Sequence, residues 1–247
     1  GSKFGVPIDE ATSAFRYAAD NPALDPIGVS FHVGSQLIDT SPITEAAEAA
    51  AELWRSLAYE GIELEDFDVG GGLGVAYEGG AEPPIAGYLR PLVEISQSLG
   101  AALVLELGRW LTAEAGVLLT RVLYTKQLGD RTIAVCDAGM NDLLRPALYQ
   151  AWHPIDLLTA DDSRASVSVD VVGPVCESAD FFALDRRLPT PRQGDVIRVG
   201  FAGAYARVMS STYNARPLPP EVLVDGDRWR TIRERRPIDD LSRGESA

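Results

Sequence analysis

The segment LEDFDVGGGLG, residues 64–74, decides the fold of the first half of this chain. Its first six residues predict a short strand, and four glycines follow within the next five positions. A helix is predicted over residues 85–99. The order strand, glycine-rich turn and helix is typical of one βα unit, whose turn lies at the carboxyl end of the strand.

The same order recurs on both sides of this segment. Upstream, a helix is predicted over residues 8–19, a strand over residues 27–33, and a second helix that ends near Tyr59. Ser41 is predicted to be the N-cap of that second helix. Downstream, a third strand is predicted over residues 102–106. Strands that alternate with helices indicate parallel pairing.

Residues 1–113 are therefore predicted to be part of a (β/α)8 barrel, with three βα units visible. A complete barrel has eight units, so about 150 residues of barrel would lie outside this sequence. The three parallel strands could instead form a small open sheet. In both folds, functional groups gather at the carboxyl ends of the strands.

The pattern changes after Ala113, where short β-rich runs are separated by turn signals such as Leu128-Gly129-Asp130. These runs lie at residues 117–124, 132–136, 166–172, 195–199 and 220–224. Residues 114–247 are predicted to form a mostly antiparallel sheet or barrel domain with a short helix near residues 143–152. The tail from Arg235 onward is expected on the surface.

Composition limits the class of protein. The 247 residues are 46% hydrophobic, and the net charge is −14 from 22 basic and 36 acidic residues, so nucleic acid is not expected as a partner. The two cysteines, Cys136 and Cys176, predict neither a disulfide framework nor a metal site. We find no apolar run that predicts a membrane span and no signal-peptide pattern, so a cytoplasmic protein is expected.

Candidate binding groups follow the predicted strands of the first half. The glycine cluster could cradle an anion with its N–H groups or be only a tight turn. His32 and Ser35 could meet the ring and phosphate of a cofactor, or the histidine could be purely structural. Glu106 and Arg109 could bind a ring nitrogen and an anionic group, or form a plain ion pair.

The second half carries another set. Arg145 and Tyr149 are four residues apart and would share a helix face suited to a carboxylate, unless they are a surface arginine and a packed tyrosine. Tyr205 follows a glycine and could be a site residue or a core aromatic. Cys176 and Glu177 follow a Gly-Pro turn and could be a proton donor and an anchor for a cation, or a buried cysteine beside a solvated glutamate.

Five strings in the chain are together similar to the alanine-racemase-type (fold type III) pyridoxal phosphate decarboxylases. They are HVGSQ (32–36), DVGGGLG (68–74), NDLLRPALYQAWH (141–153), VVGPVCES (171–178) and MSSTYNARP (209–217). The resemblance covers nearly the whole chain. The RPALY and CES segments favour members that act on diaminopimelate over those that act on ornithine or arginine.

The resemblance implies decarboxylation of meso-2,6-diaminopimelate to L-lysine and CO2, a step of lysine biosynthesis, by a homodimer. Cys176 would donate a proton after CO2 leaves, and it would reach with Glu177 into the partner subunit's site. The implied cofactor-binding residues are His32, Ser35, Gly70, Gly71, Gly72, Glu106, Gly108, Arg109 and Tyr205. The implied substrate-binding residues are Arg109, Arg145, Tyr149, Glu177 and Tyr205.

Two features depart from the family pattern. Leu107 stands where the family usually has proline. The lysine that forms a Schiff base with the cofactor lies on an early barrel strand in the family, and neither Lys3 nor Lys126 matches its motif. We therefore expect a C-terminal portion that turns over poorly alone. A non-catalytic binding or regulatory protein of the same fold, and a related basic amino-acid decarboxylase, stay open as alternatives.

Overall fold

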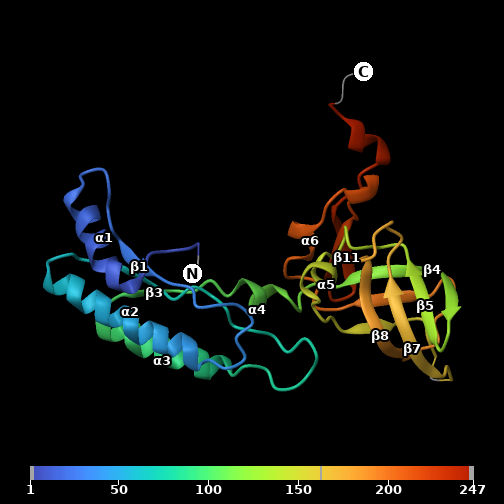
Figure 1. Cartoon of the computed structure of the whole chain (residues 1–247), viewed down its shortest axis with the longest axis horizontal. Coiled ribbons are helices and arrows are strands. Elements are labelled where there is room, and N and C mark those ends of the chain that lie inside the picture. Colours follow the sequence, from blue (N-terminus) through green and yellow to red (C-terminus); the bar gives the residue numbers. More distant parts are fainter. Residues whose placement is uncertain (1–2, 162, 245–247) are drawn as a thin grey trace. The chain divides into compact units, whose positions relative to one another are not determined.

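The computed structural model describes residues 3–161 and 163–244 (Figure 1). The chain divides into two compact units, residues 1–111 and residues 112–247. We call them the helix–sheet unit and the sheet unit and describe each by itself. In the described part of the chain, we find no helix that combines the length and the apolar character needed to cross a membrane.

The helix–sheet unit contains a three-stranded parallel sheet with the order β1-β2-β3. Its elements are α1 (Ile8–Asp20), β1 (Gly28–Ser30), α2 (Ser41–Tyr59), β2 (Asp66–Asp68), α3 (Ile85–Leu99) and β3 (Ala102–Val104). A short helix, α4 (Gly108–Thr112), follows β3. Because the strands are parallel, the segments that follow them emerge at one edge of the sheet, which we call the carboxyl edge.

The core of the helix–sheet unit forms around Phe67, in the central strand. This side chain is 0% exposed, and its ring packs edge-on against Trp54 of α2 and against Phe31, with centroids 6.0 and 5.9 Å away. Helices α2 and α3 lie side by side (Figure 1). Buried positions in α2 recur every three or four residues, as in Ala47, Ala51 and Trp54, which is why this segment forms a helix against the sheet.

Helices α2 and α3 have the predicted bounds, whereas each strand is shorter than predicted. Only three residues of each strand enter the ladder, because the chain turns away where the carboxyl-edge loops begin. The predicted cap at Ser41 was wrong. Thr40 is the N-cap, and Ser41 donates its N–H and hydroxyl to the Asp39 carboxylate at 3.0 and 2.9 Å.

The sheet unit is built on a six-stranded mixed sheet with the order β6-β9-β4-β5-β7-β8. Strands β5 and β7 pair in parallel, and the other neighbours are antiparallel. A separate antiparallel hairpin joins the last two strands. The strands are β4 (Leu118–Leu128), β5 (Arg131–Cys136), β6 (Ile155–Leu157), β7 (Ser166–Val172), β8 (Phe181–Pro189), β9 (Val196–Val199), β10 (Glu221–Asp225) and β11 (Arg228–Arg233).

Strand β4 shapes this sheet by pairing with two partners along its length. Its first half pairs with β9 and its second half with β5, and the register shifts between Val122 and Tyr124. Such an irregularity lets a strand bend. The bent sheet encloses an apolar core that includes Val122, Val169, Phe182 and Ile197.

Short helices complete the sheet unit: α5 (Arg145–Tyr149), α6 (Ala206–Met209) and the 3-10 helices η1 (Tyr213–Ala215) and η2 (Ile238–Ser242). Strand β7 has the predicted bounds, and the bounds of β4, β5, β9 and β10 lie within four residues of the predicted runs. Strands β6, β8 and β11 were not predicted. Lys126 lies in β4 opposite Ile133.

Candidate functional site

The predicted residues of the first half lie at the carboxyl edge of the parallel sheet. His32 follows β1, the glycine turn of residues 70–72 follows β2, and Glu106 follows β3. His32 and Glu106 are exposed, whereas Gly70 and Gly71 are buried. The fold therefore collects these segments at one edge, as parallel pairing requires.

The three glycines let main-chain atoms of neighbouring loops approach without side chains between them. An ideal Cβ would lie 2.5 Å from the Phe31 oxygen at Gly70, 2.2 Å from the Glu106 oxygen at Gly71, and 2.4 Å from the Gly34 oxygen at Gly72. Gly70 and Gly72 also have positive φ values of 66° and 99°. No other residue type fits this turn without moving the backbone.

Hydrogen bonds join the three carboxyl-edge loops. The Gly71 N–H donates to Nδ1 of His32 at 3.3 Å, and the Glu106 N–H donates to the Gly70 carbonyl at 2.7 Å. The Gly70 N–H donates to the carboxylate of Asp68 at 2.8 Å. The structure thus brings His32, the glycine turn and the backbone of Glu106 into direct contact.

Arg109, at the start of α4, connects to a second pair of groups. Its Nη2 donates to the Ser35 hydroxyl at 2.9 Å, and its Nη1 donates to the Tyr77 hydroxyl at 3.1 Å. Leu107, where proline was expected, is buried in the core of the helix–sheet unit, and Gly108 begins α4. A guanidinium and a hydroxyl at hydrogen-bond distance form a donor set suited to an anion.

In the sheet unit, Cys176 and Glu177 lie in the turn between β7 and β8, and Asp180 holds that turn. Its carboxylate accepts the Val175 N–H and the Met140 N–H, both at 2.6 Å. A Cβ on Gly173 would lie 2.5 Å from both carboxylate oxygens, so the glycine makes room for them. Burial raises the pKa of Asp180, although the two amide hydrogen bonds oppose the shift.

The two cysteines lie in opposite environments. Cys176 is exposed, so the alternative of a buried cysteine at that position was wrong. Cys136, in β5, is buried, and burial raises the pKa of its thiol to about 12. Cys176 is therefore the one of these two thiols whose side chain is open to contact with a bound molecule.

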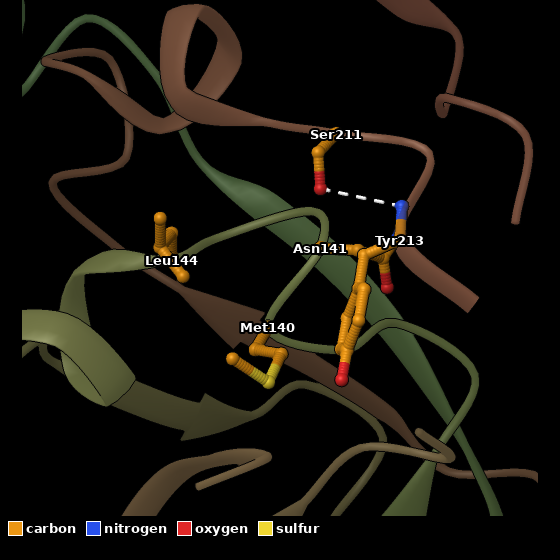
Figure 2. A pocket seen from close by; sticks show the side chains of 5 residues that line it. All are labelled: Met140, Asn141, Leu144, Ser211 and Tyr213. Atoms are coloured by element: carbon orange, nitrogen blue, oxygen red, sulfur yellow. Dashed lines mark hydrogen bonds between the residues drawn. The ribbon is translucent and has the colours of Figure 1, made fainter. Parts of the chain in front are cut away.

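A cavity of about 290 Å³ lies beside the turn between β7 and β8. Its lining comes from two segments, and Figure 2 shows the Tyr213 N–H donating to the Ser211 hydroxyl at 3.3 Å. The Tyr213 hydroxyl also donates to the Glu177 carboxylate at 3.5 Å. The lining residues are Met140, Asn141, Leu144, Ser211 and Tyr213.

Helix α5 places its two candidate residues in different environments. Arg145 is 6% exposed and donates from Nη1 to Nε2 of His153 at 2.9 Å, whereas Tyr149 is 62% exposed. The alternative of a surface arginine beside a packed tyrosine was therefore wrong in both parts. Tyr205, also expected as either a site or a core residue, is 40% exposed and adopts a positive φ of 67°.

Three residues at these places were not predicted from the sequence: His153, Asp180 and Tyr213. Each lies in or beside a string already singled out, but its contact comes from a distant segment. Asp180 reaches Met140, 40 positions away, and Tyr213 reaches Glu177, 36 positions away. The one signal in the sequence was an acidic residue, Asp180, three positions after the Cys-Glu pair.

Similarity to known proteins identifies the class to which this chain belongs. The chain belongs to the pyridoxal-dependent decarboxylase family, because residues 16–203 match the model described as "Pyridoxal-dependent decarboxylase, C-terminal sheet domain". It is 43% identical over 242 residues to a diaminopimelate decarboxylase of Helicobacter pylori, covering 98% of this chain and 60% of that protein. The diaminopimelate decarboxylase of Pseudomonas aeruginosa is 46% identical over 246 residues, covering 99% of this chain and 59% of that protein.

A solved structure supports the same relationship. The crystal structure of the H. pylori diaminopimelate decarboxylase complexed with L-lysine matches with a TM-score of 0.92 and 42% identity, covering 98% of this chain and 60% of that one. The chain thus spans about 60% of the length of the relatives it matches.

The residues at the carboxyl edge fit pyridoxal phosphate, the cofactor of this family. Ser35 and Arg109, which lie in the same unit as the glycine turn and are hydrogen-bonded to each other at 2.9 Å, offer a hydroxyl and a guanidinium suited to a phosphate. The imidazole of His32 offers a flat surface, and the exposed carboxylate of Glu106 can pair with a protonated ring nitrogen.

Proposed function

We propose that the whole protein decarboxylates meso-2,6-diaminopimelate to L-lysine and CO2 with pyridoxal phosphate. The observation that carries this proposal is the carboxyl edge of β1–β3, where His32, the glycine turn and Glu106 meet in a family of known cofactor chemistry. The named relatives, at 43% and 46% identity, support diaminopimelate as the substrate.

The helix–sheet unit would hold the cofactor. His32 would stack on the ring, the glycine turn and Ser35 would bind the phosphate, and Glu106 would keep the ring nitrogen protonated. Gly108 and Arg109 would complete this site, and Arg109 would also contact the substrate. When bound, pyridoxal phosphate supplies an electron sink for the pair left by departing CO2.

The sheet unit would bind the far end of the substrate and return a proton. Arg145 and Tyr149 would hold the distal carboxylate, and Glu177 would hold the distal ammonium. The exposed thiol of Cys176 would donate a proton to the carbon that has lost CO2. Tyr205 would contact both cofactor and substrate.

Architecture and assembly belong to the same proposal. The helix–sheet unit, up to about residue 113, would be the C-terminal part of a (β/α)8 barrel, and residues 114–247 the mainly antiparallel domain that follows it. The other barrel units would come from the part of the relatives that this chain does not match. A homodimer would bring Cys176 and Glu177 to the partner subunit's cofactor.

The test uses the full-length protein that contains this chain. We expect CO2 and L-lysine to form in equal amounts from meso-diaminopimelate when pyridoxal phosphate is bound. Cys176→Ala should lower kcat by about 100-fold or more through loss of the proton donor. The matched control is Cys136→Ala, a buried thiol of the same unit, which should keep kcat within a few-fold. No CO2 release from a cofactor-loaded protein would refute the proposed substrate.

A further inference from the structure

His153 is a buried residue that is hydrogen-bonded to Arg145, the arginine proposed to bind the substrate. Its side chain is 0% exposed, and both of its ring nitrogens make hydrogen bonds. Nε2 lies 2.9 Å from Nη1 of Arg145, and Nδ1 lies 2.9 Å from the carbonyl oxygen of Gly200. A buried imidazole satisfied at both ends holds whatever it contacts in one orientation.

The two partners decide the tautomer of this histidine. A guanidinium nitrogen can only donate, so Nε2 of His153 must be the unprotonated acceptor. A carbonyl oxygen can only accept, so Nδ1 must carry the proton. The ring is therefore neutral, and it fixes Arg145 without adding a charge of its own.

The backbone around His153 is itself fixed by neighbouring strands. The Gly200 N–H donates to the Pro154 carbonyl at 2.8 Å, next to the pairing of β6 with β9. Gly200 has no room for a side chain, because a Cβ would lie 2.9 Å from Cγ of Pro154. Arg186 of β8 donates to the His153 carbonyl at 3.0 Å.

The contact matters because α5, which carries Arg145, is only five residues long. A helix of this length does little to set the direction of a long side chain. A guanidinium recognises a carboxylate as a planar fork, so its plane must be set before the ligand arrives. The bond to Nε2 fixes one corner of that plane.

We propose that His153 is a positioning residue that orients Arg145 for the distal carboxylate of the substrate and so sets the preference for a ligand carrying that group. The inference rests on the proposed function, because that function assigns Arg145 to the distal carboxylate. His153 itself acts only through the arginine.

The experiment measures binding to the full-length protein loaded with pyridoxal phosphate, by calorimetry. The two probes are L-lysine, which keeps the distal carboxylate, and 1,5-diaminopentane, which lacks it. Wild-type protein should bind L-lysine more tightly. His153→Leu should weaken L-lysine binding by about tenfold, the worth of one hydrogen bond to a charged group, and leave diaminopentane within twofold.

Two further variants separate positioning from support of the fold. His153→Gln, whose side-chain oxygen can accept from Nη1, should recover most of the L-lysine affinity. In an Arg145→Ala background, His153→Leu should cause no additional loss, because the two residues act as one unit.

Equal weakening of both probes by His153→Leu would show a general structural role and overturn the proposal. Unchanged L-lysine binding, or additive losses in the double variant, would overturn it as well. If the probes behave as expected but wild-type protein releases no CO2 from diaminopimelate, the proposed reaction fails while the positioning role stands.

Discussion

Gly71 shows how strongly the candidate cofactor site depends on a missing side chain. A Cβ there would lie 2.2 Å from the Glu106 carbonyl oxygen and 3.0 Å from its carbon, both main-chain atoms that cannot rotate away. The loops after β2 and β3 would have to separate to admit a methyl group.

Gly71→Ala should therefore lower the free energy of unfolding by about 1–3 kcal/mol and weaken binding of pyridoxal phosphate. Urea unfolding and cofactor titration of the full-length protein measure the two effects. The matched control is Gly87→Ala in α3, where a Cβ would contact only the Pro84 side chain, at 3.2 and 3.6 Å. That variant should change stability by less than about 1 kcal/mol. Equal behaviour of the two variants would contradict the close main-chain contact.

Asp142 links stability to pH in the sheet unit. Its buried carboxylate accepts the Gly139 N–H at 2.9 Å and an Asn141 amide N–H at 3.0 Å. Burial raises the pKa of Asp142, while the Gly139 amide and nearby Arg216 oppose the shift. A carboxyl with a raised pKa binds its proton more tightly in the folded state, so its contribution to stability falls as pH rises through the window between the unfolded and folded values.

Asp142→Asn removes this titration. As pH rises from about 4 toward neutrality, the free energy of unfolding of the wild type should fall relative to that of the variant. Urea unfolding of both proteins at several pH values measures the difference, and taking the difference removes the titration of all other groups. A difference that stays constant with pH would show that Asp142 does not titrate abnormally.

Single residues divide clearly into those that sequence could and could not identify. Cys176 and Glu177 were candidates from the sequence because a thiol and a carboxylate follow a Gly-Pro turn, although a buried cysteine beside a solvated glutamate stayed open until the structure showed Cys176 exposed. His153 gave no such signal, because its Nδ1 is held by a hydrogen bond to the carbonyl of Gly200, 47 positions away, which only the folded chain brings close. A residue whose role is to hold another residue is visible only once the chain is folded.

Asp170 acts between elements, since it links strand β7 to both of its neighbours in the sheet, β5 and β8. Its carboxylate accepts from Arg131 of β5 at 3.0 Å and from the N–H of Asp185 in β8 at 2.8 Å. Asp185 has a positive φ of 50° where the β7–β8 register shifts, so its N–H needs a partner outside the ladder.

Asp170→Ala should lower the free energy of unfolding by about 1–3 kcal/mol, because the Asp185 N–H loses its acceptor and the β8 irregularity loses its support. Urea unfolding measures the loss, and amide exchange at Asp185 locates it. The control is Asp156→Ala, which breaks the half-exposed pair with Arg198 and should cost about 0–1 kcal/mol. Similar losses from both variants would mean that the contacts of buried Asp170 stabilise the fold no more than an exposed ion pair does.

The element pattern of the first half was the more predictable one. Helix periodicity gave the bounds of α2 and α3, and the glycine cluster marked the end of β2. In the second half β8 was missed, since Asp185, Arg186 and Arg187 interrupt its apolar pattern and Pro189 ends it. The parallel pairing of β5 with β7 was also missed, because pairing partners are set by long-range packing rather than by local sequence.

For the chain taken as a whole, we predict that neither of its two lysines is the one that binds the cofactor covalently. Lys3 is exposed with its Nζ 4.9 Å from the centre of the Phe4 ring, and Lys126 is exposed in β4 of the sheet unit. Neither matches the family's cofactor-bound lysine. The 247-residue chain mixed with pyridoxal phosphate and reduced with borohydride should therefore show no single lysine labelled in full.

Peptide mass spectrometry measures this labelling. The full-length protein, treated in the same way, is the control and should carry one fully labelled lysine outside these 247 residues. Stoichiometric labelling of Lys3 or Lys126 would mean that the chain supplies its own cofactor lysine, contrary to what the resemblance implies.

The carboxyl-edge loops of β1–β3 meet through main-chain atoms at Gly70, Gly71 and Gly72, so exchanges of nearby side chains leave their spacing unchanged. Under the proposed function, a lineage with this arrangement can change its amino-acid substrate by altering Arg145 and Glu177 while inheriting the cofactor cradle intact. Divergence of specificity would then be found at these two positions of the sheet unit and at Arg109, which the proposed function also places against the substrate. A laboratory selection for a new substrate should find its productive variants there and none among the three glycines.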